Sequence, residues 1–504
     1  MASYSRYKKL KLNSIWALIY QAIILINAFV VPKLILSFYG SEVNGLVSSI
    51  TQFLSFVTIC DLGVSAVVSA AYYKPLTSND NYVISKIFAF TKGFFRLIGI
   101  IIFVYIIVLA FIYPVLNDNS FDWAYTAVLI VSIGISQLAQ YLFGASSQLL
   151  LNSDQRAYLP LLINSVTLVI NTVATVVVVY LGGSIQLVKL STSLIYILRP
   201  ILMNIYVKKN YKIDHSVKFD INAVKQKGSG IIQHLAYIVY ENTDVIILTI
   251  FSTLKNVSVY SIYYMVICSV KRIILSFYTG FQSLFGNMLA NSETENIKKT
   301  YNFYLWSTMV IVSVIFCAVC FLIVPFVLLY TNGVADQAIY NVPTFAIIIT
   351  IALALSCVRD NMFAVIKAAG HFKKTQIPAL IEALSNLIIS AILVINFGMV
   401  GVAIGTLLST AFFTIYQAVY LNKNIVYYPI KKTLKHVVVV AISLVVCVFL
   451  CSLVKISADT AVSWIVYAIV VCGICFSIVL IFQFIFNRTE ILNMISKIRN
   501  KAKR

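Results

Sequence analysis

Long apolar runs separated by short polar segments dominate this chain. A membrane-spanning helix needs about 20 mostly apolar residues, whereas strands of outer-membrane barrels alternate over about ten residues. The runs here are long and uniformly apolar. The pattern therefore predicts an all-α integral membrane protein with about fourteen spans, at residues 14–37, 46–72, 94–116, 124–150, 158–181, 186–206, 230–252, 260–289, 303–330, 340–366, 376–397, 400–421, 437–455 and 462–486.

The composition leads to the same class of protein. Of the 504 residues, 61% are hydrophobic and only 11% are charged. A soluble protein needs a larger polar surface to cover its core, so this composition requires lipid as the solvent. The first apolar run is too long for a signal peptide, and no small-residue cleavage site follows it. We therefore expect a retained first span.

Basic residues give the formal net charge of +21, and their positions alternate along the chain. Most lie in every second polar segment, whereas the intervening segments hold only Lys33, Lys189, Lys255 and Lys455. Cytoplasmic loops carry an excess of Lys and Arg, so we expect both termini in the cytoplasm. The charge then faces anionic lipid headgroups, and nucleic acid is not an expected partner.

The two halves of the chain resemble each other. Residues 155–183, QRAYLPLLINSVTLVINTVATVVVVYLGG, align with residues 373–401, KKTQIPALIEALSNLIISAILVINFGMVG, and Pro160 matches Pro378. A repeat of six spans in one orientation predicts two pseudo-symmetric bundles with a substrate pathway between them. The expected parts are a six-helix bundle (1–206), a basic cytoplasmic linker (207–229), a second six-helix bundle (230–421), two additional helices (422–486) and a basic cytoplasmic tail (487–504).

Ionisable residues also fall inside the predicted spans. Each costs on the order of 3 kcal/mol to insert near the bilayer centre, so such residues face a polar cavity or a partner. The basic residues of this kind are Arg199, Lys271, Arg272 and Arg359, and the acids are Asp61, Glu241, Asp244, Asp360 and Glu382.

The basic residues allow more than one interpretation. Arg359 and Asp360 are neighbours in SCVRDNMF, where they can compensate each other locally. Lys271 and Arg272 are also adjacent and lie about 100° apart on a helix, so at most one points squarely into a cavity. Glu382 lies close to the inner end of its span, where water can solvate it.

Two acids share one helix face in YENTDVIILT. Glu241 and Asp244 are three residues apart, and two close acids repel when both ionise. One is expected to keep its proton at neutral pH, which is the chemistry of a proton or cation site. The alternative is an acid pair neutralised by Lys271 or Arg359 in a packed interface.

The sequence contains no recognisable metal-binding, phosphate-binding or catalytic motif. Nine cysteines lie mostly in apolar runs, and the pairs Cys317/Cys320 and Cys472/Cys475 have no histidine nearby. We interpret them as apolar filler and expect no metal site. There is no phosphate-binding GxxxxGK[ST] loop, no paired histidine and no nucleophile constellation. No cofactor and no catalytic residue are expected, and the chain is not predicted to be an enzyme.

Four segments carry a family resemblance: residues 38–76, FYGSEVNGLVSSITQFLSFVTICDLGVSAVVSAAYYKPL, then ENTDVIIL, NVSVYSIYYMV and IKAAGHFKKTQ. They resemble the polysaccharide-transport branch of oligosaccharide flippases, in the superfamily of multidrug exporters and the lipid II flippase. The resemblance implies a monomer in the bacterial cell (plasma) membrane. It also implies movement of polyprenyl-pyrophosphate-linked oligosaccharides from the cytoplasmic to the outer leaflet by alternating access, coupled to protons or sodium.

The resemblance also implies roles for the charged residues. Asp244 corresponds to the acid of the seventh helix in that family, and Arg199, Lys271, Arg272 and Arg359 would supply the cations that bind pyrophosphate. Asp61, Glu241, Asp244 and Asp360 are the candidates for ion coupling. Positive partners suit a pyrophosphate in a low-dielectric cavity, while the prenyl tail remains in lipid.

Two other functions stay open. A multidrug exporter of the same fold would favour a cavity lined by acids, without central Lys or Arg. A polytopic polysaccharide polymerase or glycosyltransferase would need large outside loops with clustered charges, whereas the outside loops here, such as LNDNSFDW, are short.

Overall fold

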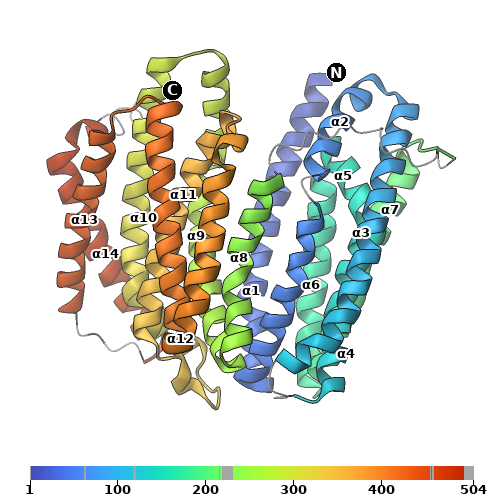
Figure 1. Cartoon of the computed structure of the whole chain (residues 1–504), viewed down its shortest axis with the longest axis horizontal. Coiled ribbons are helices and arrows are strands. Elements are labelled where there is room, and N and C mark those ends of the chain that lie inside the picture. The colour runs from blue at the N-terminus through green and yellow to red at the C-terminus, as the bar shows by residue number, and fades with distance from the viewer. Residues whose placement is uncertain are drawn as a thin grey trace. The chain divides into compact units, whose positions relative to one another are not determined.

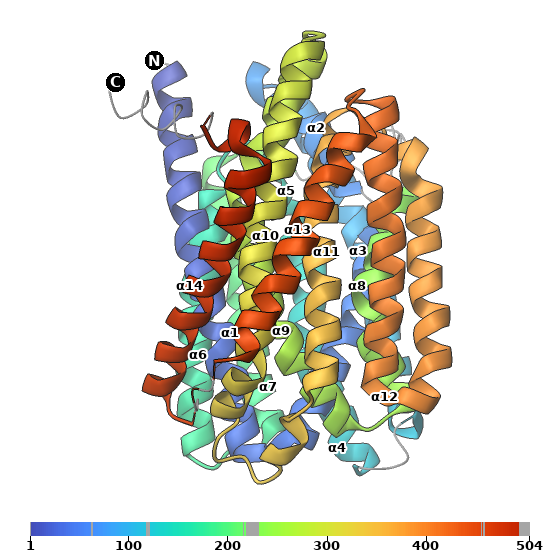
Figure 2. The same ribbon diagram turned by 90° about the vertical axis from the view of Figure 1, so that its left-hand side faces the viewer.

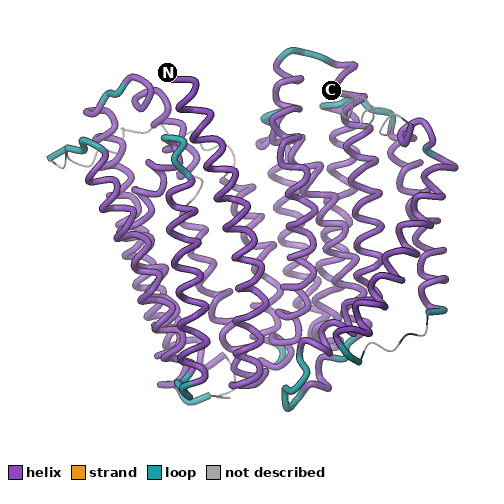
Figure 3. Tube along the Cα trace, turned by 180° about the vertical axis from the view of Figure 1, so that it is seen from behind, coloured by secondary structure: helices purple, strands orange, loops and turns teal. Residues whose placement is uncertain are grey.

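The computed structural model describes residues 2–61, 64–116, 121–214, 216–217, 231–454, 456 and 459–492. Within these ranges the chain is helical and contains no strand (Figure 3), which confirms the predicted all-α class. Most of the predicted linker 207–229, Lys455 and the predicted tail beyond residue 492 lie outside the described residues.

The chain forms two compact units, Met1–Ser258 and Val259–Arg504. Figures 1 and 2 label the helices of both. The elements of the first unit are α1 (Ala2–Ser55), the 3-10 helix η1 (Phe56–Asp61), α2 (Val64–Ser78), α3 (Asn81–Leu116), α4 (Trp123–Ala139), the π-helix η2 (Gln140–Gly144), α5 (Ala145–Ser153), α6 (Tyr158–Tyr180), α7 (Ile185–Asn210) and α8 (Ile231–Phe251).

The second unit begins within α9 (Leu254–Ala290). It continues with α10 (Thr294–Tyr330), the 3-10 helix η4 (Gln337–Tyr340), α11 (Pro343–Ala368), α12 (Phe372–Asn424), α13 (Ile430–Ser452) and α14 (Ala461–Phe486). Among the described residues, eleven helices are long and apolar enough to cross a membrane, and each of the two longest contains a kink.

Glycines mark the kinks that the hydrophobic pattern predicted as gaps between spans. Gly40 in α1 has φ 83° and Gly398 in α12 has φ 53°, a region that residues with a Cβ rarely adopt. The predicted span 46–72 is itself interrupted, because α1 gives way to η1 and α2 starts only at Val64. Gly182, with φ 74°, turns the chain between α6 and α7, and Gly398 bends it within α12.

Basic segments meet at one end of the first unit. The Nζ atom of Lys9 lies 3.1 Å from Oδ1 of Asp154, and Nε of Arg156 lies 2.7 Å from Oδ2 of the same residue. The hydroxyl of Tyr211, at the end of α7, donates to Asp154 Oδ2 over 2.6 Å. Three segments predicted to face the cytoplasm are therefore at the same end of this unit.

A similar junction lies in the second unit. Asn302 in α10 donates from Nδ2 to Oε1 of Glu490 over 3.1 Å, and its Oδ1 lies 3.1 Å from Nε2 of His436 in α13. Tyr428, between α12 and α13, donates to the same Oδ1. The start of α10, the entry to α13 and the segment after α14 thus share one end, as the alternation of basic loops predicts.

The second half of α1 packs closely against α8 and the start of α9. Asn44 donates to Ser258 over 2.7 Å, and the hydroxyls of Ser49 and Thr249 are 2.6 Å apart. A Cβ placed on Gly45 would lie 1.8 Å from the carbonyl oxygen of Leu254. Small residues and interhelical hydrogen bonds of this kind let membrane helices approach closely.

Gly45→Ala is expected to destabilise the protein, because the new methyl group overlaps a backbone atom that cannot move aside alone. Overpacking of this kind costs about 1–3 kcal/mol. Gly473→Ala in α14 is the matched control, since nothing lies within 4 Å of its built Cβ. Thermal unfolding in detergent should show a lower midpoint for Gly45→Ala only. Equal midpoints would mean that α1 and the start of α9 are not in close contact.

Candidate functional site

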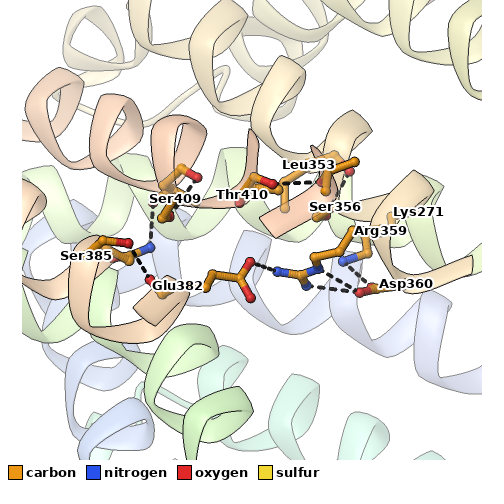
Figure 4. Close-up of polar contacts among 12 residues, drawn as sticks. Lys271, Leu353, Ser356, Arg359, Asp360, Glu382, Ser385, Ser409 and Thr410 are labelled. Atoms are coloured by element: carbon orange, nitrogen blue, oxygen red, sulfur yellow. Dashed lines mark hydrogen bonds and ion pairs between the residues drawn. The ribbon is translucent and has the colours of Figure 1, made fainter. Parts of the chain in front are cut away.

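A chain of four charged side chains, of which three are buried, lies within the second unit. Lys271 lies on α9, Arg359 and Asp360 on α11, and Glu382 on α12 (Figure 4). Their formal charges cancel when all four are ionised. The sequence predicted charges at these positions, and the tertiary structure brings the three helices together so that the charges meet.

Asp360 is shared by two cations. Its Oδ2 lies 2.8 Å from Nζ of Lys271, and its Oδ1 accepts from Nη2 and Nε of Arg359 over 2.9 Å and 3.1 Å. The predicted local compensation between Arg359 and Asp360 is confirmed. The Asp360 side chain is 25% exposed, so this carboxylate is the accessible member of the chain of charges.

Glu382 lies at the end of the network opposite Lys271 and pairs with Arg359. Nη1 of Arg359 donates to Oε1 of Glu382, and only 3% of Arg359 and 5% of Glu382 are exposed. The expectation that water solvates Glu382 is therefore wrong. Arg359 reaches both carboxylates with its planar fork of donors, an arrangement that a lysine cannot reproduce.

The reason for this pairing lies in the hairpin of α11 and α12. The chain turns at Gly370, with φ 69°, and Arg359 and Glu382 lie at nearly equal distances along the chain on either side of it. Residues at matching heights of an antiparallel hairpin face each other. This symmetry about Gly370 is a signal in the sequence that would have added Glu382 to the candidate site.

Lys271 and Arg272 have different environments. Lys271 is 8% exposed and pairs with Asp360, whereas Arg272 is exposed on the surface of α9. The expectation that at most one of them points inward is confirmed.

The acids of α8 belong to the first unit. Asp244 is buried and Glu241 is partly buried. On the same helix, Asn242 accepts from Gln52 in α1 over 2.5 Å, and also from Ser55. Polar contacts to α1 thus hold the helix segment that carries both carboxylates.

Two other candidates in the first unit have structural partners. Arg199 on α7 donates from Nε to Thr167 in α6 over 2.8 Å, and its guanidinium carbon lies 3.5 Å from the ring centre of Tyr196. Asp61 ends η1, and its Oδ1 accepts from the hydroxyl and the backbone N–H of Ser65 over 2.8 Å and 3.3 Å. These bonds satisfy donors in the first turn of α2, as a helix cap does.

Solved transporters share this fold. The lipid II flippase MurJ, in an inward closed conformation, is 17% identical with a TM-score of 0.71, and the match covers 95% of this chain and 99% of that chain. An inward-facing multidrug resistance MATE family transporter of the MOP superfamily is 12% identical with a TM-score of 0.60, covering 81% of this chain and 98% of its own. An outward-facing MATE family transporter is 14% identical with a TM-score of 0.53, covering 82% and 95%.

Sequence comparisons add no family assignment. No protein-family model matches the chain, and no curated protein sequence matches it. At the identities given above, the structural likeness establishes the fold alone, which this chain shares with these solved membrane transporters.

Proposed function

We propose that this protein flips polyprenyl-pyrophosphate-linked oligosaccharide from the cytoplasmic to the outer leaflet of a bacterial plasma membrane, as a monomer with both termini in the cytoplasm. The observation that carries the proposal is the pair of buried cations, Lys271 and Arg359, within the helices of a transporter fold. The fold supports alternating access, because MATE family members with it have been solved in inward-facing and outward-facing states.

The network suits an anionic substrate that binds and leaves. Lys271 and Arg359 already hold a carboxylate, Asp360, through charge-assisted hydrogen bonds. A pyrophosphate offers oxygens of the same kind, so it can exchange with the accessible Asp360 without leaving a cation buried and unpaired. Arg199 is proposed as a further contact to the substrate headgroup, and Arg272, which is exposed, as a weaker one.

Ion coupling would follow from the same exchange. A displaced Asp360 loses its positive partners and lies beside the anionic pyrophosphate, and both changes favour its neutral form, so it takes up a proton. Asp244, Glu241 and Asp61 are proposed as the remaining acids of a proton or sodium path. Coupling to proton or sodium entry would give the transport its direction.

A multidrug exporter of the same fold is the second candidate. A transported organic cation would meet Lys271 and Arg359 in the second unit, and like charges in a low dielectric repel strongly. The match to the lipid II flippase also covers more of this chain than the matches to the two MATE transporters. Both observations favour the lipid-linked substrate.

Deletion of the gene, followed by leaflet-resolved detection of lipid-linked oligosaccharide, separates the two functions. Accumulation of the oligosaccharide in the cytoplasmic leaflet, with recovery on complementation, is the expected result. Normal surface polysaccharide together with drug hypersensitivity would overturn the proposal in favour of an exporter.

Asp244→Asn is expected to reduce transport at least about tenfold while the protein still inserts, because a neutral amide keeps the shape but cannot carry a proton. Transport would be measured in cells that produce equal amounts of both proteins. The double variant Asn242→Asp/Asp244→Asn is the control, because it places a carboxylate two residues earlier on α8. It tests whether a carboxylate at another position of this helix restores transport. Wild-type activity of Asp244→Asn would mean that the Asp244 carboxylate has only a structural role.

A further inference from the structure

Four cysteines from three helices meet in the apolar core of the second unit. They are Cys317 on α10, Cys447 and Cys451 on α13, and Cys475 on α14, and all four are buried. The three helices lie side by side in Figures 1 and 2. Their buried hydrophobic neighbours include Ala318, Tyr467 and Val471.

The sulfur atoms have the spacing of metal ligands. Sγ of Cys317, Cys447 and Cys475 all lie within 4.8 Å of one another, and Sγ of Cys451 lies 3.8 Å from Sγ of Cys475. A tetrahedral ion with metal–sulfur bonds of about 2.3 Å holds its sulfurs about 3.8 Å apart. Small side-chain rotations would bring the three mutually close sulfurs onto one ion.

The thiols are available for such a role. All four are free cysteines, with no disulfide between them. Cys447 and Cys451 are four residues apart on α13, which places both on one helix face, the spacing with which helices present paired metal ligands. Each CxxC pair, by contrast, contributes only one member to the cluster, since Cys472 is exposed and Cys320 is only partly buried.

We propose that Cys317, Cys447 and Cys475, with Cys451 as a fourth donor, bind one thiophilic d¹⁰ cation, Zn²⁺ or Cu⁺, between α10, α13 and α14. Soft thiolate donors select these ions, whereas Mg²⁺ and Ca²⁺ require oxygen ligands. Each cysteine that ligates as a thiolate releases its proton to solvent, and no electron is transferred. The ion would fasten the two helices that follow the predicted repeat, α13 and α14, to α10.

The site is independent of the proposed transport chemistry. Its residues lie on α10, α13 and α14, whereas the charged network lies on α9, α11 and α12. Loss of the metal is therefore expected to loosen the attachment of α13 and α14 without removing a charge from that network.

Metal content of the full-length protein tests the proposal. Protein purified in detergent under reducing, anaerobic conditions is loaded separately with Zn²⁺ and with Cu⁺, dialysed, and its metal measured. We expect about one ion per chain in one of the two arms, which identifies the cation. Cys447→Ala and Cys475→Ala should each lower the retained metal at least about tenfold, whereas Cys472→Ala and Cys320→Ala should keep the wild-type ratio.

A second measurement needs no variant. Co²⁺ in place of the native ion should give the intense sulfur-to-cobalt absorption of a thiolate site in the wild-type protein, and Zn²⁺ should remove it. Absence of this absorption together with no retained Zn²⁺ or Cu⁺ would overturn the proposal. Equal metal retention in all four alanine variants, or a disulfide within the cluster under the reducing conditions, would also overturn it.

Discussion

Arg359→Gln is expected to abolish transport and to lower the yield of folded protein. The substitution removes the positive partner from two carboxylates at once, and Glu382, of which only 5% is exposed, would remain as a buried negative charge. Removing one partner of a buried ion pair costs about 3–5 kcal/mol. Asp360 is less affected, because Lys271 still holds it.

The double variant Arg359→Gln/Glu382→Gln separates stability from function. Two neutral amides can hydrogen bond to each other, so we expect the thermal midpoint to return most of the way to that of the wild type. Transport should stay absent, because one of the two buried cations is still missing. Restored transport in the double variant would show that Arg359 serves only to neutralise Glu382.

Lys271→Gln is expected to reduce transport at least about tenfold, while Arg272→Gln leaves most of it. Lys271 is buried and contacts the accessible carboxylate of Asp360, whereas its neighbour Arg272 is exposed. A hydrogen bond to a charged group is worth about 1.5–3 kcal/mol, which corresponds to one or two powers of ten in rate. Asp360 keeps Arg359 as a partner in Lys271→Gln, so the fold should survive.

Lys271→Gln and Arg272→Gln are controls for each other, since each removes one positive charge and the two positions are consecutive on α9. Transport of lipid-linked oligosaccharide and the folded yield would be measured for both variants. Equal loss in the two would mean that overall charge, and not the buried contact with Asp360, determines activity. Retention of full transport in Lys271→Gln would remove this lysine from the substrate path.

Hydrophobic patterning accounts for the helices but not for all of their interruptions. Long apolar runs predict spans because lipid satisfies no backbone hydrogen bond, so the chain must form helices. The gaps at Gly40 and Gly398 were visible as short breaks in that pattern. The interruption at η1 was not visible, because residues 46–72 are apolar on both sides of Asp61, and the hydropathy does not distinguish a bent segment from a straight one.

Charged positions were found from the sequence, but their partners were only partly found. Arg359 and Asp360 are neighbours in the chain, so their ion pair follows from local geometry. Glu382 was assigned to water, because its depth depends on how α12 folds back on α11 at Gly370. The distinction between Lys271 and Arg272 required the same kind of information, namely which face of α9 meets α11.

The sequence by itself determined that this protein needs lipid as its solvent, and it determined the all-α class, the positions of most spans and the presence of charges that lipid cannot stabilise. These properties depend on composition and on periods of a few residues. Only the tertiary structure decided which charges pair between helices and which cysteines meet. Those contacts join residues that are far apart along the chain, such as Lys271 with Asp360 and Cys317 with Cys475. They depend on helix rotation and depth, which the apolar pattern of a membrane helix leaves free.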